Sequence, residues 1–125
     1  MKKLLAIISL FMMVLPSSIA ATENEEDCIG RYKIYQTDNI YSLLKLDTKT
    51  GSLWLVYWSL EDNGEGTYVL HRETLVNEKY EKCHAFELYP TKNMYQFILL
   101  NTISGQQWHV QWGFESAKRW IRKIY

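Results

Sequence analysis

The sequence is poor in the residues that most often carry catalysis or bind metals. Its 125 residues include only two cysteines, three histidines and two prolines, and the formal net charge at pH 7 is zero. It contains no Cys-x-x-Cys or His-x-x-x-His pair, no Gly-x-Ser-x-Gly and no phosphate-binding glycine loop. A neutral chain also has no broad electrostatic attraction to nucleic acid or to anionic membranes. The sequence therefore predicts a protein that is not an enzyme, uses no cofactor or metal and has no nucleic-acid partner.

Long apolar runs are absent except for one at the N-terminus. Lys2 and Lys3 precede an apolar stretch over residues 4–15, and a group of small residues ends at Ala20. The stretch is shorter than the roughly 20 residues that a helix needs to span a bilayer. The pattern is typical of a signal peptide over residues 1–20 that is cleaved on export. We therefore expect an exported protein, periplasmic or extracellular, with no membrane span after cleavage.

The rest of the chain is organised by an internal duplication. Residues 32–60 align without a gap on residues 86–114, at an offset of 54, and ten of these 29 positions are identical. A repeat of this length usually corresponds to one structural unit, so it decides the architecture before any single motif does. The duplication predicts one domain over residues 31–125, preceded by an acidic tail over residues 21–30.

Within the domain, each copy has the pattern of four short strands. In the first copy, alternating and apolar stretches predict strands over residues 32–35, 40–46, 52–59 and 67–71. The sequence Asp-Thr-Lys-Thr-Gly, ending at Gly51, joins the second strand to the third, and this glycine supplies the positive φ of a tight hairpin turn.

Three boundaries follow from the duplication: repeat one over residues 31–71, a connection over 72–84 and repeat two over 85–125. In repeat two, residues 118–125 take the place of the fourth strand, although a basic C-terminal helix would also fit their pattern. The expected fold is all-β, with two tandem, pseudo-symmetric, four-stranded antiparallel meanders. Together they would form a small sandwich or an eight-stranded barrel.

The two cysteines occupy similar places, just before the first strand of each repeat. Export would make a disulfide between Cys28 and Cys83 chemically possible. Such a bond would close a loop of about 55 residues and stabilise the fold by roughly 4 kcal/mol. Two separate thiols are the alternative, and we favour the bond.

Aromatic residues are the best candidates for function, with five tryptophans, nine tyrosines and four phenylalanines. The tryptophans of the third strands are expected to form core, because His109 and Gln111 lie on the opposite face in repeat two and would be costly to bury. This expectation covers Trp54, Trp58, Trp108 and Trp112. The candidate ligand-binding residues are tyrosines at equivalent positions of the two repeats, which could stack on sugar rings or contact a protein. They are Tyr35, Tyr41, Tyr89 and Tyr95.

Two resemblances add to this interpretation. The segment from Leu46 to Trp54 resembles the Leu-Asp-x-x-Thr-Gly-x-x-x-Trp motif of quinoprotein-type β-propeller blades, but is one residue shorter before the tryptophan. It implies a hairpin turn held by Asp, Thr and Gly and no quinone site, since two blades cannot close a propeller. The region from Arg31 to Trp112 resembles small exported bacterial proteins built from tandem units of this kind, with Tyr-x-Thr-x-Asn-x-Tyr before the turn and Trp-x-Val-x-Trp after it. This second resemblance implies fold and export, and no particular activity.

Taken together, these features predict an exported, non-enzymatic binding module. It would recognise a glycan or a protein partner, such as another envelope protein, through an aromatic surface. The alternative is a structural or envelope-assembly protein that has no small ligand.

Overall fold

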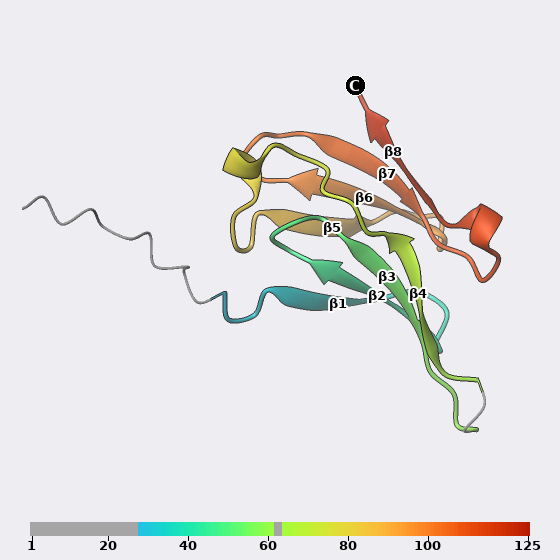
Figure 1. Cartoon of the computed structure of the whole chain (residues 1–125). Helices are drawn as coiled ribbons and strands as arrows, with labels where there is room; N and C mark the ends of the chain where they lie inside the picture. Colours follow the sequence, from blue (N-terminus) through green and yellow to red (C-terminus); the bar gives the residue numbers. More distant parts are fainter. Residues whose placement is uncertain (1–27, 62–63) are drawn as a thin grey trace, which may run out of the picture.

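The computed structural model describes residues 28–61 and 64–125 (Figure 1). The expected signal peptide over residues 1–20, and all of the acidic tail before Cys28, lie outside the described residues. Within the described ranges, no helix is both long enough and apolar enough to cross a membrane.

The described chain forms two four-stranded antiparallel sheets, each a simple meander. The first sheet contains β1 (Tyr32–Gln36), β2 (Ser42–Asp47), β3 (Leu53–Tyr57) and β4 (Gly66–His71). The second contains β5 (Phe86–Pro90), β6 (Gln96–Asn101), β7 (Gln107–Gln111) and β8 (Trp120–Ile124). Short 3₁₀ helices, η1 (Glu78–Tyr80) and η2 (Ser116–Lys118), precede β5 and β8. The expected all-β fold is confirmed, and the C-terminal segment forms a strand and not a helix.

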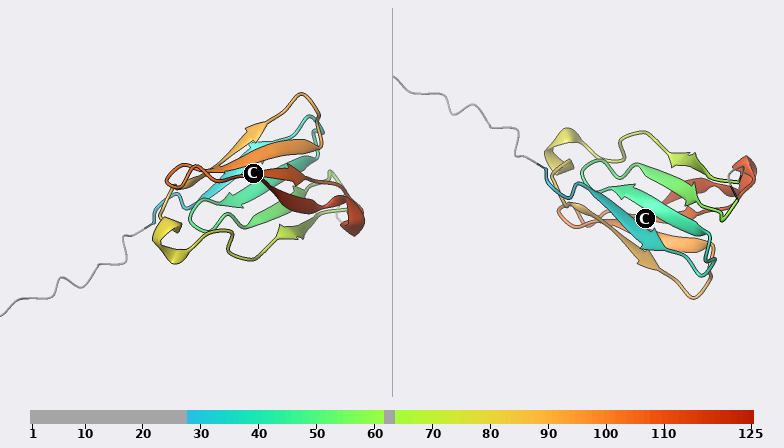
Figure 2. Two further views of the ribbon diagram at one scale, coloured as in Figure 1. Left: turned by 90° about the horizontal axis from the view of Figure 1, so that it is seen from above. Right: turned by 90° about the horizontal axis from the view of Figure 1, so that it is seen from below.

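The two sheets lie as two layers. Seen from above, the second sheet lies in front of the first, and from below the order is reversed (Figure 2). In the described part of the chain, no strand of one sheet pairs with a strand of the other, so the arrangement is not a closed barrel. One hydrophobic core, to which both sheets contribute, lies between the layers.

The sheets do not bury equivalent faces. The first sheet turns inward the face that carries Leu44, Leu46, Leu53 and Leu55. The second turns inward the face that carries Phe97, Leu99, Trp108 and Val110. The repeat equates Phe97 with Leu43, which lies on the outer side of the first sheet. The two sheets are therefore stacked facing the same way, whereas a twofold relation would have buried the same face of each.

This stacking decides which tryptophans are buried. Trp108 and Trp112 are 3% and 1% exposed, as the expectation of core tryptophans requires. In the first repeat the expectation is wrong, since Trp54 is only half-buried and Trp58 is 37% exposed. The reason is that β3 is apolar on both faces, so burial of its leucines is as favourable as burial of its indoles. The polar residues that keep one face of β7 outward have no counterpart in β3.

The two hairpin turns between the second and third strands of each sheet have the expected construction. Gly51 and Gly105 have φ values of 83° and 75°, in the left-handed region that favours glycine. Asp47 Oδ1 accepts a hydrogen bond from the Lys49 N–H (3.0 Å), and Asn101 Oδ1 accepts one from the Ser104 N–H (2.9 Å). Each side chain therefore pins the turn that follows its own strand.

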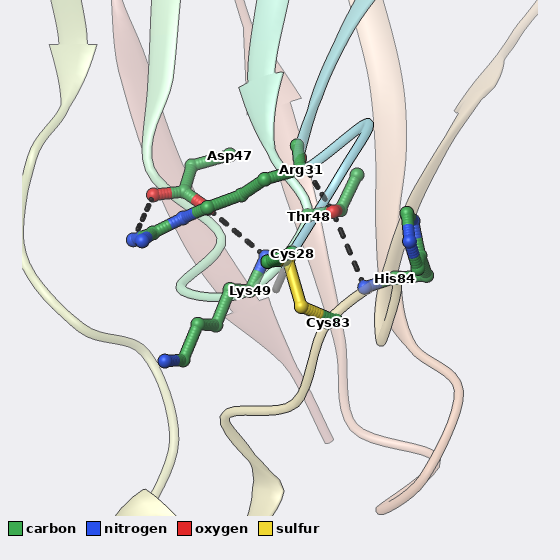
Figure 3. The surroundings of a disulfide bond; sticks show 7 residues. All are labelled: Cys28, Arg31, Asp47, Thr48, Lys49, Cys83 and His84. Carbon is green, nitrogen blue, oxygen red and sulfur yellow. Dashed lines mark hydrogen bonds and ion pairs between the residues drawn. A yellow bond between two sulfur atoms is a disulfide. The ribbon is translucent and has the colours of Figure 1, made fainter. Parts of the chain in front are cut away.

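A disulfide bond joins Cys28 to Cys83, with Cα atoms 5.7 Å apart (Figure 3). Beside it, the Thr48 hydroxyl donates to the Arg31 carbonyl and accepts from the His84 N–H, which lies 3.3 Å away. The bond confirms the favoured pairing and ties the beginning of the first sheet to the chain that enters the second. A disulfide is typical of a protein that folds in an oxidising compartment.

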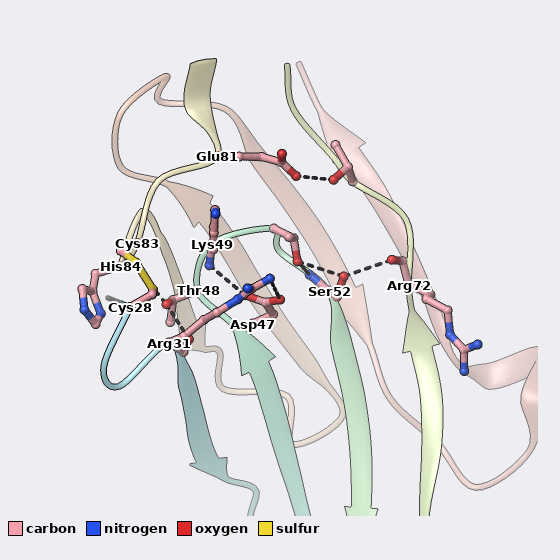
Figure 4. Close-up of polar contacts among 12 residues, drawn as sticks. Cys28, Arg31, Asp47, Thr48, Lys49, Ser52, Arg72, Glu81, Cys83 and His84 are labelled. Carbon is pink, nitrogen blue, oxygen red and sulfur yellow. Dashed lines mark hydrogen bonds and ion pairs between the residues drawn. A yellow bond between two sulfur atoms is a disulfide. The ribbon is translucent and has the colours of Figure 1, made fainter. Parts of the chain in front are cut away.

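An ion pair reinforces the same end of the molecule (Figure 4). Arg31 Nη2 lies 2.8 Å from Asp47 Oδ2, and Arg31 Nε donates to Asp47 Oδ1 at 2.9 Å. Burial acts to raise the pKa of Asp47, but hydrogen bonds from Arg31 and from the Lys49 N–H, with the charge of Arg31, bring this pKa below its ordinary value. We call this region, with the disulfide and both glycine turns, the disulfide end.

Candidate functional site

The opposite end of the molecule is built by a motif that both repeats share. Each sheet has Thr-x-Asn-x-Tyr between its first two strands. In the second sheet, Thr91 Oγ1 donates to the Gln96 carbonyl (2.8 Å), and Asn93 Oδ1 accepts from the Tyr95 N–H (3.0 Å). These local bonds fold the chain into a turn that places the tyrosine at the end of the sheet. Equivalent bonds form around Asn39 in the first sheet.

A tryptophan lies beside each of these tyrosines. The backbone N–H of Trp58 donates to the Tyr41 carbonyl, and the backbone N–H of Trp112 donates to the Tyr95 carbonyl, both at 3.0 Å. The ring centroids lie 5.2 Å apart in the first pair and 5.0 Å apart in the second. The turns that carry these two aromatic pairs lie at one end of the molecule, on the right in Figure 1, where the chain also forms η2.

Contacts between the two sheets join these pairs into one cluster. Phe114 packs edge-to-face against Tyr57 of the first sheet (5.4 Å between centroids) and against Trp112 of the second (5.8 Å). Tyr57 in turn lies 6.3 Å from Tyr41. Tilted and edge-to-face pairs of this kind are the favourable arrangement of aromatic rings. We call the cluster the aromatic end, and it consists of Tyr41, Tyr57, Trp58, Tyr95, Trp112 and Phe114.

The second sheet's side of the aromatic end is hollowed by a cavity of about 330 Å³. Its lining is Asn93, Tyr95, Gln111, Trp112, Gly113, Phe114, Glu115 and Lys118. Trp112 forms the buried floor, and its indole is fixed because Nε1 donates to the Met94 carbonyl (2.8 Å). Tyr95 and Phe114, whose rings both contact Trp112, remain about half exposed. The cavity is thus an open hollow with a rigid aromatic floor.

Polar side chains stand around this floor. Gln111 is held in place because its Oε1 accepts from Gln96 Nε2 and its Nε2 donates to the Lys118 carbonyl, both at 3.2 Å. Lys118 Nζ lies 3.9 Å from Glu115 Oε2, and both side chains are largely exposed. Exposed pairs of this kind contribute little to stability, so both charged groups are free to contact a ligand. The hollow can therefore combine ring stacking with hydrogen bonds.

The four tyrosines proposed from the sequence do not form one surface. Tyr41 and Tyr95 belong to the aromatic end. Tyr35 is half-buried on the edge strand β1 and packs against the core, and burial raises its pKa. Tyr89 lies exposed on β5, where its hydroxyl donates to Glu87 Oε2 and this hydrogen bond raises the tyrosine pKa. That these four residues bind a ligand stays a prediction.

Several residues of the aromatic end were not identified as site residues from the sequence. For Trp58 and Trp112 the sequence did hold a usable signal. In each repeat the same tyrosine precedes the second strand and the same tryptophan follows the third, so the two residues are expected at one end of the sheet. Tyr57 and Phe114 gave no such signal, since their repeat equivalents are Gln111 and Leu60. Only the packing of one sheet on the other brings these two rings together.

Comparison of the chain with protein-family models, with curated proteins and with solved structures found no match. Over residues 28–61 and 64–125, no three His, Cys, Asp or Glu side chains gather in a way that could hold a metal ion.

Proposed function

We propose that the protein is an exported, non-enzymatic binding module that holds a glycan at the aromatic end. The observation that supports this most is the hollow itself, where aromatic rings and hydrogen-bonding side chains converge. Sugar rings have apolar C–H faces that stack on aromatic side chains, and hydroxyl groups that pair with amides and charged groups. A volume of about 330 Å³ is near the lower end of ligand pockets, which suits a short saccharide or one sugar unit of a longer chain.

The rigidity of the floor also favours binding. Trp112 is buried and hydrogen-bonded, and the rings of Tyr95 and Phe114 lie 5.0 and 5.8 Å from it. A site whose rings are already in place loses little conformational entropy when a ligand binds. Gln111 is equally restrained, so its amide offers hydrogen bonds in a fixed direction.

Export is part of the proposal because glycans are abundant at cell surfaces and in the envelope. The Cys28–Cys83 disulfide supports an oxidising compartment. The signal-peptide pattern over residues 1–20 and the resemblance to small exported β-repeat proteins point the same way.

The test is a glycan array with the purified, disulfide-bonded protein, followed by calorimetric titration with the best saccharide. Tyr95→Ala should weaken binding by about tenfold or more, equivalent to about 1.4 kcal/mol. Tyr89→Ala is a matched control, because Tyr89 is 44% exposed and Tyr95 is 45% exposed, but only Tyr95 lines the hollow. Far-UV circular dichroism of both variants shows that each is folded.

Three outcomes would count against the proposal. An array with no binding by a folded protein would favour the alternative of a structural or envelope-assembly component. Equal losses in Tyr95→Ala and Tyr89→Ala would place the site elsewhere. Cleavage of the bound saccharide, seen by mass spectrometry after incubation, would contradict the non-enzymatic part of the proposal.

A further inference from the structure

The outward side of the first sheet is an apolar face that nothing in the described structure covers. We call it the first outer face, and its apolar members are Tyr32, Ile34, Leu43, Trp54, Val56 and Val69. The strand registers place these side chains on one side of β1 to β4. Tyr32 and Ile34 are each 55% exposed, and Trp54 is half-buried with its ring 6.4 Å from that of Tyr32. Contiguous apolar surface of this kind marks an interaction site more often than chance exposure does.

The internal repeat shows what such a face does when it is covered. The equivalents of Tyr32, Ile34, Leu43, Trp54 and Val56 are Phe86, Leu88, Phe97, Trp108 and Val110. All five of these are buried in the core between the sheets. The same face is thus a sheet-packing surface in the second repeat, and the first repeat retains its apolar character. The inferred occupant is therefore another β-sheet.

The outward side of the second sheet is more polar along its central strand β7. Gln107, His109 and Gln111 stand there in place of Leu53, Leu55 and Tyr57 of the first sheet. Arg122 also lies on this side, with its guanidinium 4.8 Å from the ring of Trp120. Ile98, Leu100, Trp120 and Ile124 share this side, so apolar side chains flank its polar central strand. The polar groups of β7 make this side a poorer surface for packing a further sheet than the first outer face.

We propose that two copies of the chain pair through their first outer faces to form a symmetric dimer. A head-to-tail contact would instead place the first outer face against Gln107, His109 and Gln111 of β7, and would take their polar groups out of water. It would also leave a free face at each end and allow open-ended growth. The twofold pairing removes both apolar faces from water and is complete with two copies. Twofold dimers are also the commonest soluble oligomers.

Lys45 is the one charged residue in the middle of the first outer face. Its ammonium lies 4.8 Å from the Trp54 ring, and its repeat equivalent is the fully buried Leu99. Taking the ammonium out of water opposes pairing, so the dimer is a dissociable one. Lys45→Leu should tighten the dimer by about tenfold or more, because each copy then loses a charge that pairing would desolvate.

The experiment is sedimentation velocity of the full disulfide-bonded protein over a concentration series from micromolar to millimolar. The matched variants are Ile34→Glu and Ile124→Glu. Both isoleucines lie exposed on edge strands, Ile34 on the first outer face and Ile124 on the outer side of the second sheet. Wild type and Ile124→Glu should form a dimer as concentration rises, and Ile34→Glu should remain monomeric with an unchanged circular dichroism spectrum.

Other results would overturn the inference. A wild-type protein and a Lys45→Leu variant that are both monomeric throughout the series would show that the face does not pair with itself. Dissociation of the dimer by Ile124→Glu as well as by Ile34→Glu would show a head-to-tail contact. A dimer that survives Ile34→Glu would use some other surface.

Discussion

Trp108 and Trp54 occupy the same position of the repeat, and the structure places their indoles in opposite surroundings. Trp108 is 3% exposed in the core, 5.9 Å from the Phe86 ring, whereas Trp54 lies half-exposed on the first outer face. Replacing the buried indole by alanine should lower the free energy of unfolding by about 3–5 kcal/mol. Trp54→Ala removes the tilted contact between the indole and the Tyr32 ring and the contact with the Lys45 ammonium above it. This change should lower the free energy of unfolding by only about 1 kcal/mol.

Urea unfolding of the two variants, followed by far-UV circular dichroism, measures both losses. The protein should be dilute enough that copies do not associate, because Trp54 lies on the proposed dimer face. A domain of this size has only about 5–15 kcal/mol of stability, so Trp108→Ala should be marginally folded and Trp54→Ala close to wild type. Equal losses, or a larger loss for Trp54→Ala, would refute the conclusion that the two sheets bury opposite faces.

Three further predictions concern the disulfide end. Replacing Cys28 and Cys83 by serine should lower the free energy of unfolding by about 4 kcal/mol for a separation of 55 residues, and reduction of the wild type with dithiothreitol should give the same loss in urea. Asp47→Asn keeps the turn cap but loses the ion pair, and should cost about 1–2 kcal/mol at neutral pH. Because the folded-state pKa of Asp47 is lowered, its stabilisation is present above the ordinary carboxyl pKa and is lost as pH falls through the lowered value. Acid titrations of stability should therefore be flatter for the variant, and equal slopes would contradict the ion pair. Gly51→Ala should destabilise more than Gly105→Ala in thermal unfolding, since both have positive φ but only at Gly51 would the added Cβ meet a buried ring, at 2.9 Å.

For the candidate site, the sequence identified part of what the structure assembles. Tyr41 and Tyr95 were proposed from their repeated positions, and both lie at the aromatic end. Tyr57 and Phe114 were not, because they contact each other across the two sheets while standing 57 positions apart in the sequence. Periodicity within one strand carries no information about such a contact.

From the sequence alone the strands, their order and the turns could be predicted, and a strand was favoured over a helix for the C-terminal segment. These features depend on local or repeated signals: alternation along a strand, the positive φ of Gly51 and Gly105, and the requirement that both copies fold alike. The placement of each cysteine just before the first strand of its repeat was also enough to favour the disulfide.

Which face of each sheet turns inward is settled by the packing of one sheet on the other. In β7, Gln107 and His109 leave a single apolar face, and reasoning from periodicity alone orients the strand correctly. In β3, Leu53 and Leu55 oppose Trp54 and Val56, so both faces are apolar and either could be buried. The hydrophobic effect is non-directional and favours the burial of either apolar face. The choice between them therefore depends on which face fits the surface that the second sheet presents.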